Sequence, residues 1–160
     1  MENKNSKRIF LVEDDPFYRE LVLSHLCDEG YLNVECCRSA EEFSDNLYKN
    51  PDIIFLDYNL EDKNGLDILR EIKGFNPDIH VVFLSAQNTI QVAVDALRYG
   101  ALEYIVKDDM ALDKINNVLM NISRLDQIII KHDMKNKTLI NTLTVLLAFA
   151  VITCTLLIIN

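Results

Sequence analysis

Five short strand-like segments recur along the sequence, and the stretches between them have the apolar spacing of helices. The segments cover residues 9–12, 32–37, 53–56, 79–84 and 102–106. A continuous apolar run bounded by charge is typical of a strand in a parallel sheet, where both faces are buried. Alternation of such strands with helices predicts an α/β fold, in which right-handed crossovers join five parallel strands into a doubly wound sheet.

Local signals mark where the helices begin and end. Pro16 opens the first helix, because its missing N–H costs nothing in a first turn, and Gly30 ends that helix. Ser39 and Glu42 form a capping box at the start of the second helix. The later helices are expected over residues 66–75, over 88–100 and from about residue 111 onward. A helix therefore follows each strand.

Polar side chains follow four of the five strands. The carboxyl ends of parallel strands meet at one edge of the sheet, where open α/β sheets bind ligands. Carboxylates suit Mg²⁺, and an aspartate can accept a phosphoryl group once its charge repulsion with the incoming anion is relieved. The edge is therefore predicted to hold a metal ion and to accept a phosphoryl group. Its residues in chain order are Glu13, Asp14, Asp15, Asp57, Ser85 and Lys107.

The overall charge and the cysteines exclude several other classes of function. The net charge of −9 and the pI near 4.7 argue against a nucleic-acid-binding surface, which is normally basic. The four cysteines lack metal-ligand spacing, and a disulfide framework is not expected in a chain of this size and type. Residues 1–7 are polar and lack the apolar stretch of a signal peptide. The globular part is therefore expected in the cytoplasm.

Taken together, these motifs resemble the receiver domain of two-component response regulators. The resemblance covers roughly residues 7–127, and its motifs stand in the family's order. They are the acidic pair Glu13-Asp14, the acceptor Asp57, Gly65 eight residues beyond it, Ser85-Ala86, Tyr104 and Lys107. The resemblance implies a flavodoxin-like five-stranded parallel sheet of order 2-1-3-4-5. It also implies phosphorelay signal transduction by a phosphoacceptor switch that is not an enzyme, with self-dephosphorylation left open.

The same resemblance implies a cofactor and its ligands. Asp57 is the expected phosphoacceptor, and Mg²⁺ is the expected cofactor. Asp14 and Asp57 are the expected direct carboxylate ligands, with Glu13 acting through water. The backbone carbonyl of Asn59 is a further expected ligand.

The remaining site residues also take their expected roles from the resemblance. Lys107 would pair with the acceptor carboxylate or with an attached phosphoryl group, and Ser85 would turn toward a phosphoryl oxygen. Tyr104 would switch between exposed and buried positions. His25 has no partner nearby in the sequence, and helix packing is its expected role. The expected donor is therefore another protein, a sensor histidine kinase or a histidine phosphotransfer protein.

An apolar segment follows the receiver-like part. Residues 138–159 carry no charge, and at about 1.5 Å per residue a helix of this length can cross a bilayer. Lysines precede the segment and no charged side chain follows it, which predicts a cytoplasmic N-terminal side. We therefore predict a receiver domain over 7–127, a helical linker with a basic juxtamembrane run over 128–137, and a single-pass transmembrane helix over 138–159 that anchors the chain to the inner membrane. The alternative is a buried helix of a soluble oligomer.

Apolar residues also continue at three- and four-residue steps between Leu112 and Ile129. This spacing can form a short coiled-coil seam with another copy, so a homodimer is left open. Few residues follow the receiver-like part, and output is therefore expected through protein–protein contacts at the membrane.

Two other functions compete with the phosphoacceptor reading. One is a membrane-tethered docking module that works without phosphorylation, but such a module has no reason to keep the acidic pair, Ser85 and Lys107 together. The other is a haloacid dehalogenase-type phosphohydrolase. Those enzymes usually need a second acid two residues beyond the nucleophile, where this chain has Asn59.

Overall fold

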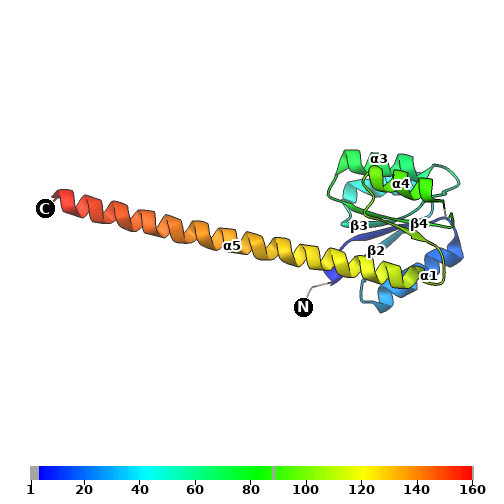
Figure 1. Cartoon of the computed structure of the whole chain (residues 1–160), viewed down its shortest axis with the longest axis horizontal. Coiled ribbons are helices and arrows are strands. Elements are labelled where there is room, and N and C mark those ends of the chain that lie inside the picture. Colours follow the sequence, from blue (N-terminus) through cyan, green and yellow to red (C-terminus); the bar gives the residue numbers. More distant parts are fainter. Residues whose placement is uncertain (1–3, 88, 160) are drawn as a thin grey trace. The chain divides into compact units, whose positions relative to one another are not determined.

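The computed structural model describes residues 4–87 and 89–159; the side chains of residues 5, 133 and 148–159 lie outside this description. Five strands alternate with five helices (Figure 1). The strands are β1 (Ile9–Val12), β2 (Val34–Cys37), β3 (Ile53–Asp57), β4 (His80–Ser85) and β5 (Glu103–Val106). The helices are α1 (Pro16–Asp28), α2 (Ala40–Asn46), α3 (Gly65–Phe75), α4 (Ile90–Arg98) and α5 (Ala111–Ile159), with short 3-10 turns η1 (Lys4–Ser6) and η2 (Leu47–Lys49).

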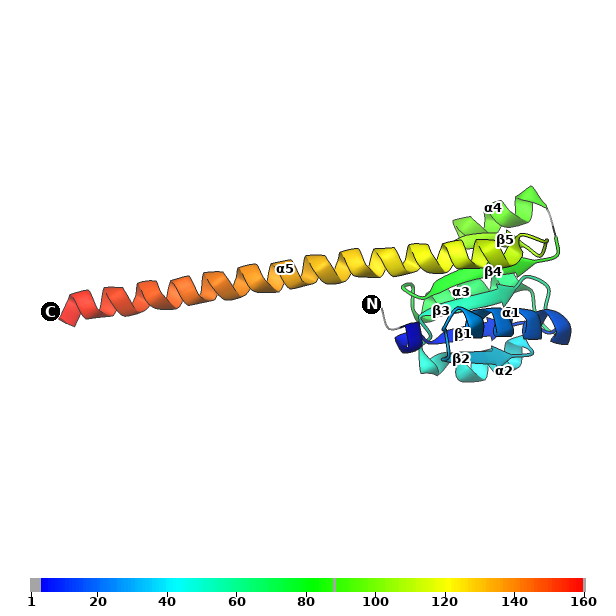
Figure 2. The ribbon, with the colours of Figure 1, turned by 90° about the horizontal axis from the view of Figure 1, so that it is seen from below.

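The strands form one parallel sheet in the order β2-β1-β3-β4-β5 (Figure 2). This confirms the predicted α/β class, the parallel sheet and the strand order. The second strand is shorter than predicted. It begins at Val34, and Leu32 before it is 67% exposed because it lies outside the sheet.

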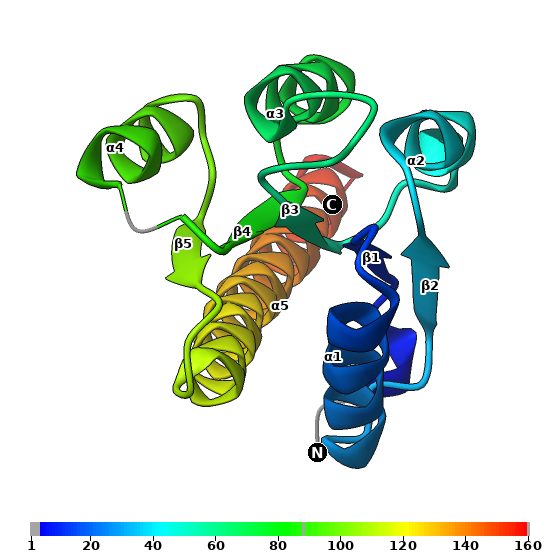
Figure 3. The same ribbon diagram turned by 90° about the vertical axis from the view of Figure 1, so that its right-hand side faces the viewer.

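Helices cover both faces of the sheet. Helices α2, α3 and α4 lie on one face, and α1 lies on the other together with residues 111–118 of α5 (Figure 3). Successive side chains of a strand point to opposite faces. Phe10 and Val12 accordingly join the core cluster that includes residues of α2 and α3, whereas Ile9 and Leu11 are buried on the face of α1. Burial on both faces explains why β1 reads as an unbroken apolar run.

The helix starts follow from local hydrogen bonds. The Asp15 carboxylate caps α1 by accepting from the backbone N–H groups of Phe17 (2.8 Å) and Tyr18 (3.3 Å). The Ser39 hydroxyl caps α2 by accepting from the N–H of Glu42 at 3.1 Å. Both caps match the sequence prediction, and the first one fixes the direction in which α1 leaves the acidic pair.

The chain divides into two compact units. The N-terminal unit extends to Val118 and contains the whole sheet, and the C-terminal unit begins at Leu119. Helix α5 runs without a break from Ala111 to Ile159. The predicted division into a receiver, a linker and a terminal segment therefore corresponds to no gap in secondary structure.

The transmembrane helix predicted over residues 138–159 has no support in the structure. Within the described residues, no helix is long and apolar enough to cross a membrane. Four polar residues, Thr138, Asn141, Thr142 and Thr144, interrupt the apolar side chains of the described range 138–147. Residues 148–159 are helical, but their side chains lie outside the described part.

Candidate functional site

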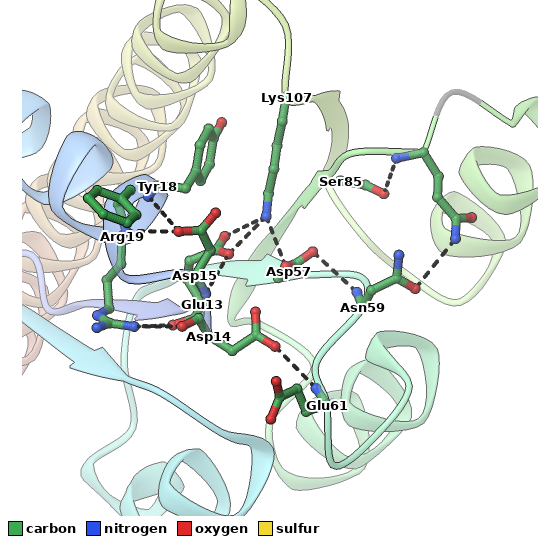
Figure 4. A network of polar contacts seen from close by, with 12 residues as sticks. Glu13, Asp14, Asp15, Tyr18, Arg19, Asp57, Asn59, Glu61, Ser85 and Lys107 are labelled. Atoms are coloured by element: carbon green, nitrogen blue, oxygen red, sulfur yellow. Dashed lines mark hydrogen bonds and ion pairs between the residues drawn. The ribbon is translucent and has the colours of Figure 1, made fainter.

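The register of the sheet brings the polar strand ends together. Val12 pairs with Leu56, and Asp57 pairs with Leu84, so Glu13 lies beside Asp57 at the carboxyl edge. Ser85 pairs with Val106, which places Lys107 at the same edge. Glu13, Asp57 and Ser85 are the buried polar residues of the described chain, and they are 0%, 5% and 0% exposed. Figure 4 shows their side chains facing one another across the ends of three strands.

Three carboxylates form the acidic part of the site. One oxygen each from Glu13, Asp14 and Asp57 lies within 4.8 Å of the others. Asp14 is half-buried, and one of its carboxylate oxygens accepts from the N–H of Glu61 at 3.2 Å. Hard oxygen ligands at this spacing fit Mg²⁺, which takes one or two carboxylates and completes its shell with water and phosphoryl oxygens.

Lys107 is the cation of the site. Its Nζ lies 2.8 Å from Asp57 Oδ2, and 2.9 and 2.7 Å from the two oxygens of Glu13. Burial alone would lower the pKa of this ammonium, but the hydrogen bonds to Asp57 and Glu13 outweigh it and raise the pKa. Lys107 is therefore firmly charged and balances part of the buried negative charge.

The charge balance of the site is incomplete, and Glu13 shows this. Burial, assisted by the charge of Asp57 and opposed by Lys107, raises the pKa of Glu13 from 4.5 to about 7. One lysine therefore does not compensate three crowded carboxylates. A divalent cation held by these oxygens would supply the missing charge, which supports the fit of Mg²⁺ to this donor set.

Two residues of α1 support the site, and the sequence did not single them out. Arg19 Nη1 donates to the backbone carbonyls of Glu13 (2.8 Å) and Asp14 (3.2 Å). The Tyr18 ring lies against Lys107, with Nζ 4.6 Å from its centroid. Burial and the neighbouring carboxylates raise the pKa of Tyr18 to about 12. The signal available in the sequence was their position in the first turn after the Asp15 cap.

Ser85 and Tyr104 belong to a second chain of contacts at the edge. Ser85 Oγ accepts from the N–H of Gln87 at 3.0 Å and makes no described contact with Asp57. The carbonyl of Gln87 accepts from the Tyr104 hydroxyl at 2.9 Å. Tyr104 is half-buried, and its ring centroid lies 6.2 Å from that of Phe83. A rotation of the serine hydroxyl would therefore be felt at Tyr104.

Asn59 and Gly65 shape the loop beyond the acceptor. The N–H of Asn59 donates to Asp57 Oδ1 at 3.2 Å, while Gln87 Nε2 reaches Asn59 Oδ1 at 3.5 Å. No observation tests the backbone carbonyl of Asn59 as a metal ligand, and that role stays a prediction. At Gly65, a Cβ would lie 2.7 Å from the Phe83 ring and 2.9 Å from the carbonyl oxygen of Asp57. Only glycine lets α3 begin so close to the acceptor strand.

Comparison with known proteins identifies relatives of the N-terminal unit. The family model of the response regulator receiver domain matches residues 9–119. Regulatory protein LuxO of Vibrio vulnificus is 30% identical over 119 residues, which are 72% of this chain and 26% of that protein. Alginate biosynthesis transcriptional regulatory protein AlgB of Pseudomonas putida is 38% identical over 104 residues, 64% of this chain and 23% of that protein. The chain thus spans about a quarter of the length of these curated relatives.

Solved structures agree with this match. The receiver domain of NtrX from Brucella abortus is 32% identical with a TM-score of 0.65, over 71% of this chain and 95% of that one. A two-component response regulator from Clostridium difficile is 22% identical with a TM-score of 0.68, over 74% of this chain and 96% of that one. The second likeness concerns the fold alone.

Proposed function

The chain belongs to the response regulator receiver domain family, and we propose that it accepts a phosphoryl group on Asp57 in a phosphorelay. One observation carries this assignment. The Asp57 carboxylate lies 2.8 Å from the Lys107 ammonium and within 4.8 Å of the Glu13 and Asp14 oxygens. The acceptor, the cation and the metal-binding oxygens are therefore together. The donor is a phosphohistidine of a sensor histidine kinase or of a histidine phosphotransfer protein.

The transfer is a displacement at phosphorus. An Asp57 oxygen forms the new O–P bond, the P–N bond to the donor imidazole breaks, and the nitrogen keeps that electron pair. Lys107 holds Oδ2, so Oδ1, which accepts from the Asn59 N–H, is the oxygen left to attack. Positioning and charge neutralisation dominate such reactions, and these residues supply both.

Mg²⁺ fits the oxygens of Glu13, Asp14 and Asp57 and, when bound, would neutralise charge on the phosphoryl oxygens. Arg19 keeps the acidic pair in place through its bonds to both backbone carbonyls. The chain acts on no separate substrate. Loss of the phosphoryl group through hydrolysis at the same site is part of the proposed cycle.

The output begins at Ser85. A phosphoryl oxygen on Asp57 would draw the serine hydroxyl away from the N–H of Gln87, whose carbonyl holds the Tyr104 hydroxyl. Tyr104 would then change position, and the surface formed by α4 and β5 would change with it. Protein partners that read this surface are the proposed output.

A location at the inner membrane rests on the sequence of residues 138–159, and the described structure gives it no support. Flotation of the full chain with lipid vesicles, compared with a chain ending at residue 137, tests it. Equal flotation of the two chains would remove the membrane from the functional account.

The direct test of phosphoryl transfer uses acetyl phosphate and Mg²⁺ with the full chain. Intact-protein mass should increase by one phosphoryl group in the wild type and not in Asp57→Asn or in EDTA. Asp52→Asn is a matched control, because Asp52 lies at the opposite end of β3. Failure of the wild type to gain mass would favour the phosphorylation-independent docking module.

A further inference from the structure

A stripe of large aliphatic side chains runs along α5 in the C-terminal unit. From residue 125 to residue 146, seven positions follow one another at alternating steps of four and three residues: 125, 129, 132, 136, 139, 143 and 146. This average period of 3.5 keeps one face of a helix toward a partner helix in a left-handed coiled coil. Five of these positions are apolar: Leu125, Ile129, Leu139, Leu143 and Leu146.

These five side chains are uncovered in the single chain, since they are 49–66% exposed. Ile128, Ile140 and Leu147 flank the stripe with similar exposure. Burying a side chain of this size removes about 100 Å² of apolar surface from water. Eight such side chains on each of two chains give roughly 1,600 Å² in total, the size of a standard stable interface. A second helix of the same kind is therefore sufficient to cover the stripe.

The two polar members of the stripe decide how that helix must lie. His132 and Asn136 are exposed and adjacent on the helix surface, with Asn136 Nδ2 3.3 Å from His132 Nδ1. Asn136 belongs to the same set of heptad positions as Ile129 and Leu143, and His132 to the same set as Leu125 and Leu139. A single asparagine in the first set specifies register and strand number, because its amide can hydrogen-bond only to the same amide of an in-register partner.

We propose that a second copy of this chain pairs with the stripe as a parallel, in-register, two-stranded coiled coil over residues 125–146, and that Asn136 sets its register. Antiparallel or shifted pairing would place the Asn136 amide against a leucine and leave it without a partner, which is costly in a buried seam. The pairing does not depend on phosphoryl transfer, so it stands or falls separately from the function proposed for Asp57.

Disulfide cross-linking of the full chain tests both the pairing and its direction. Cys27, Cys36, Cys37 and Cys154 are first replaced by alanine or serine, and circular dichroism checks that the chain still folds. Single cysteines then replace Ile129 or Leu143 in the stripe, or Gln127 or Asn141 on the outward face. Cysteines at both stripe positions should cross-link to themselves about tenfold more than those at the outward positions, since a disulfide needs Cβ atoms about 4 Å apart.

The outcomes are distinct. Cross-linking at only one stripe position would indicate an antiparallel pair, and equal yields on both faces would leave the stripe to a lipid bilayer or to another protein; either result overturns the proposal. Light scattering of the unmodified chain in a mild detergent should give twice the chain mass of 18.4 kDa, and a monomer would overturn it too. Asn136→Leu should add species larger than a dimer, whereas the outward Asn141→Leu should not.

Discussion

The buried carboxyl of Glu13 gives a sharp prediction about the metal-free protein. Its pKa is about 7 in the folded chain, against an ordinary value of 4.5. Between these two pH values the folded state therefore binds more protons than the unfolded state does. The free energy of unfolding must fall as pH rises through this window. At about 1.4 kcal/mol for each pH unit, the Glu13 contribution to this fall is about 3 kcal/mol.

Glu13→Gln removes this titration while keeping the size of the side chain. We expect the variant to lose about 3 kcal/mol less stability than the wild type between about pH 4.5 and pH 7.5. Urea unfolding in EDTA, followed by circular dichroism at several pH values, measures the difference. Glu61→Gln is the matched control, because Glu61 is an exposed glutamate of the same edge. Equal pH slopes for the wild type and Glu13→Gln would refute a buried, uncompensated Glu13.

Further predictions concern the scaffold and the metal. Gly65→Ala should cost about 1–3 kcal/mol in urea unfolding, because its Cβ would overlap the Phe83 ring, whereas Gly74→Ala, with open space at its Cβ, should cost nothing and gain up to about 1 kcal/mol; equal losses would contradict the packing at the start of α3. Arg19→Ala should weaken Mg²⁺ binding in a calorimetric titration by about 1.5–3 kcal/mol through loss of its two carbonyl bonds, while the exposed Arg38→Ala leaves it unchanged. In the wild type, Mg²⁺ at a hundred times its Kd should raise the free energy of unfolding by about 2.7 kcal/mol, and no rise would argue against a metal site.

Strand ends were the part of the site most accessible from sequence. Glu13, Asp57, Ser85 and Lys107 each stand next to an apolar run, so a parallel sheet is enough to gather them. No knowledge of side-chain directions is needed for that step. The order of the strands came from the family resemblance, because alternation of strands and helices alone does not choose among doubly wound sheets.

Residues that reach the site from a helix were not accessible in this way. Arg19 and Tyr18 turn back toward the strand ends because the Asp15 cap sets the angle of α1, and neither spacing nor composition encodes that angle. The hydroxyl of Ser85 also differs from its expected direction, since without a phosphoryl group the N–H of Gln87 is its nearest donor. Such orientations depend on what the site holds.

The C-terminal segment shows a different limit of sequence reasoning. A charge-free stretch predicted a membrane helix, yet within the described residues the threonine hydroxyls donate to carbonyls of the preceding turn, as Thr138 does to Met134 at 2.9 Å, and no spanning helix is found there. The three- and four-residue spacing continues past Ile129, where the prediction of a seam ended. Hydrophobicity averaged over a segment hides this spacing, which is the property that selects a partner helix.

The most direct test of the central claim locates the phosphoryl group itself. After treatment with acetyl phosphate and Mg²⁺, borohydride reduction converts an aspartyl phosphate into homoserine, and mass spectrometry of the peptides identifies the position. We predict homoserine at residue 57 in the wild type, and its absence in Asp57→Asn and in EDTA. Homoserine at another aspartate, or at none, would contradict the assignment of Asp57 as the phosphoacceptor.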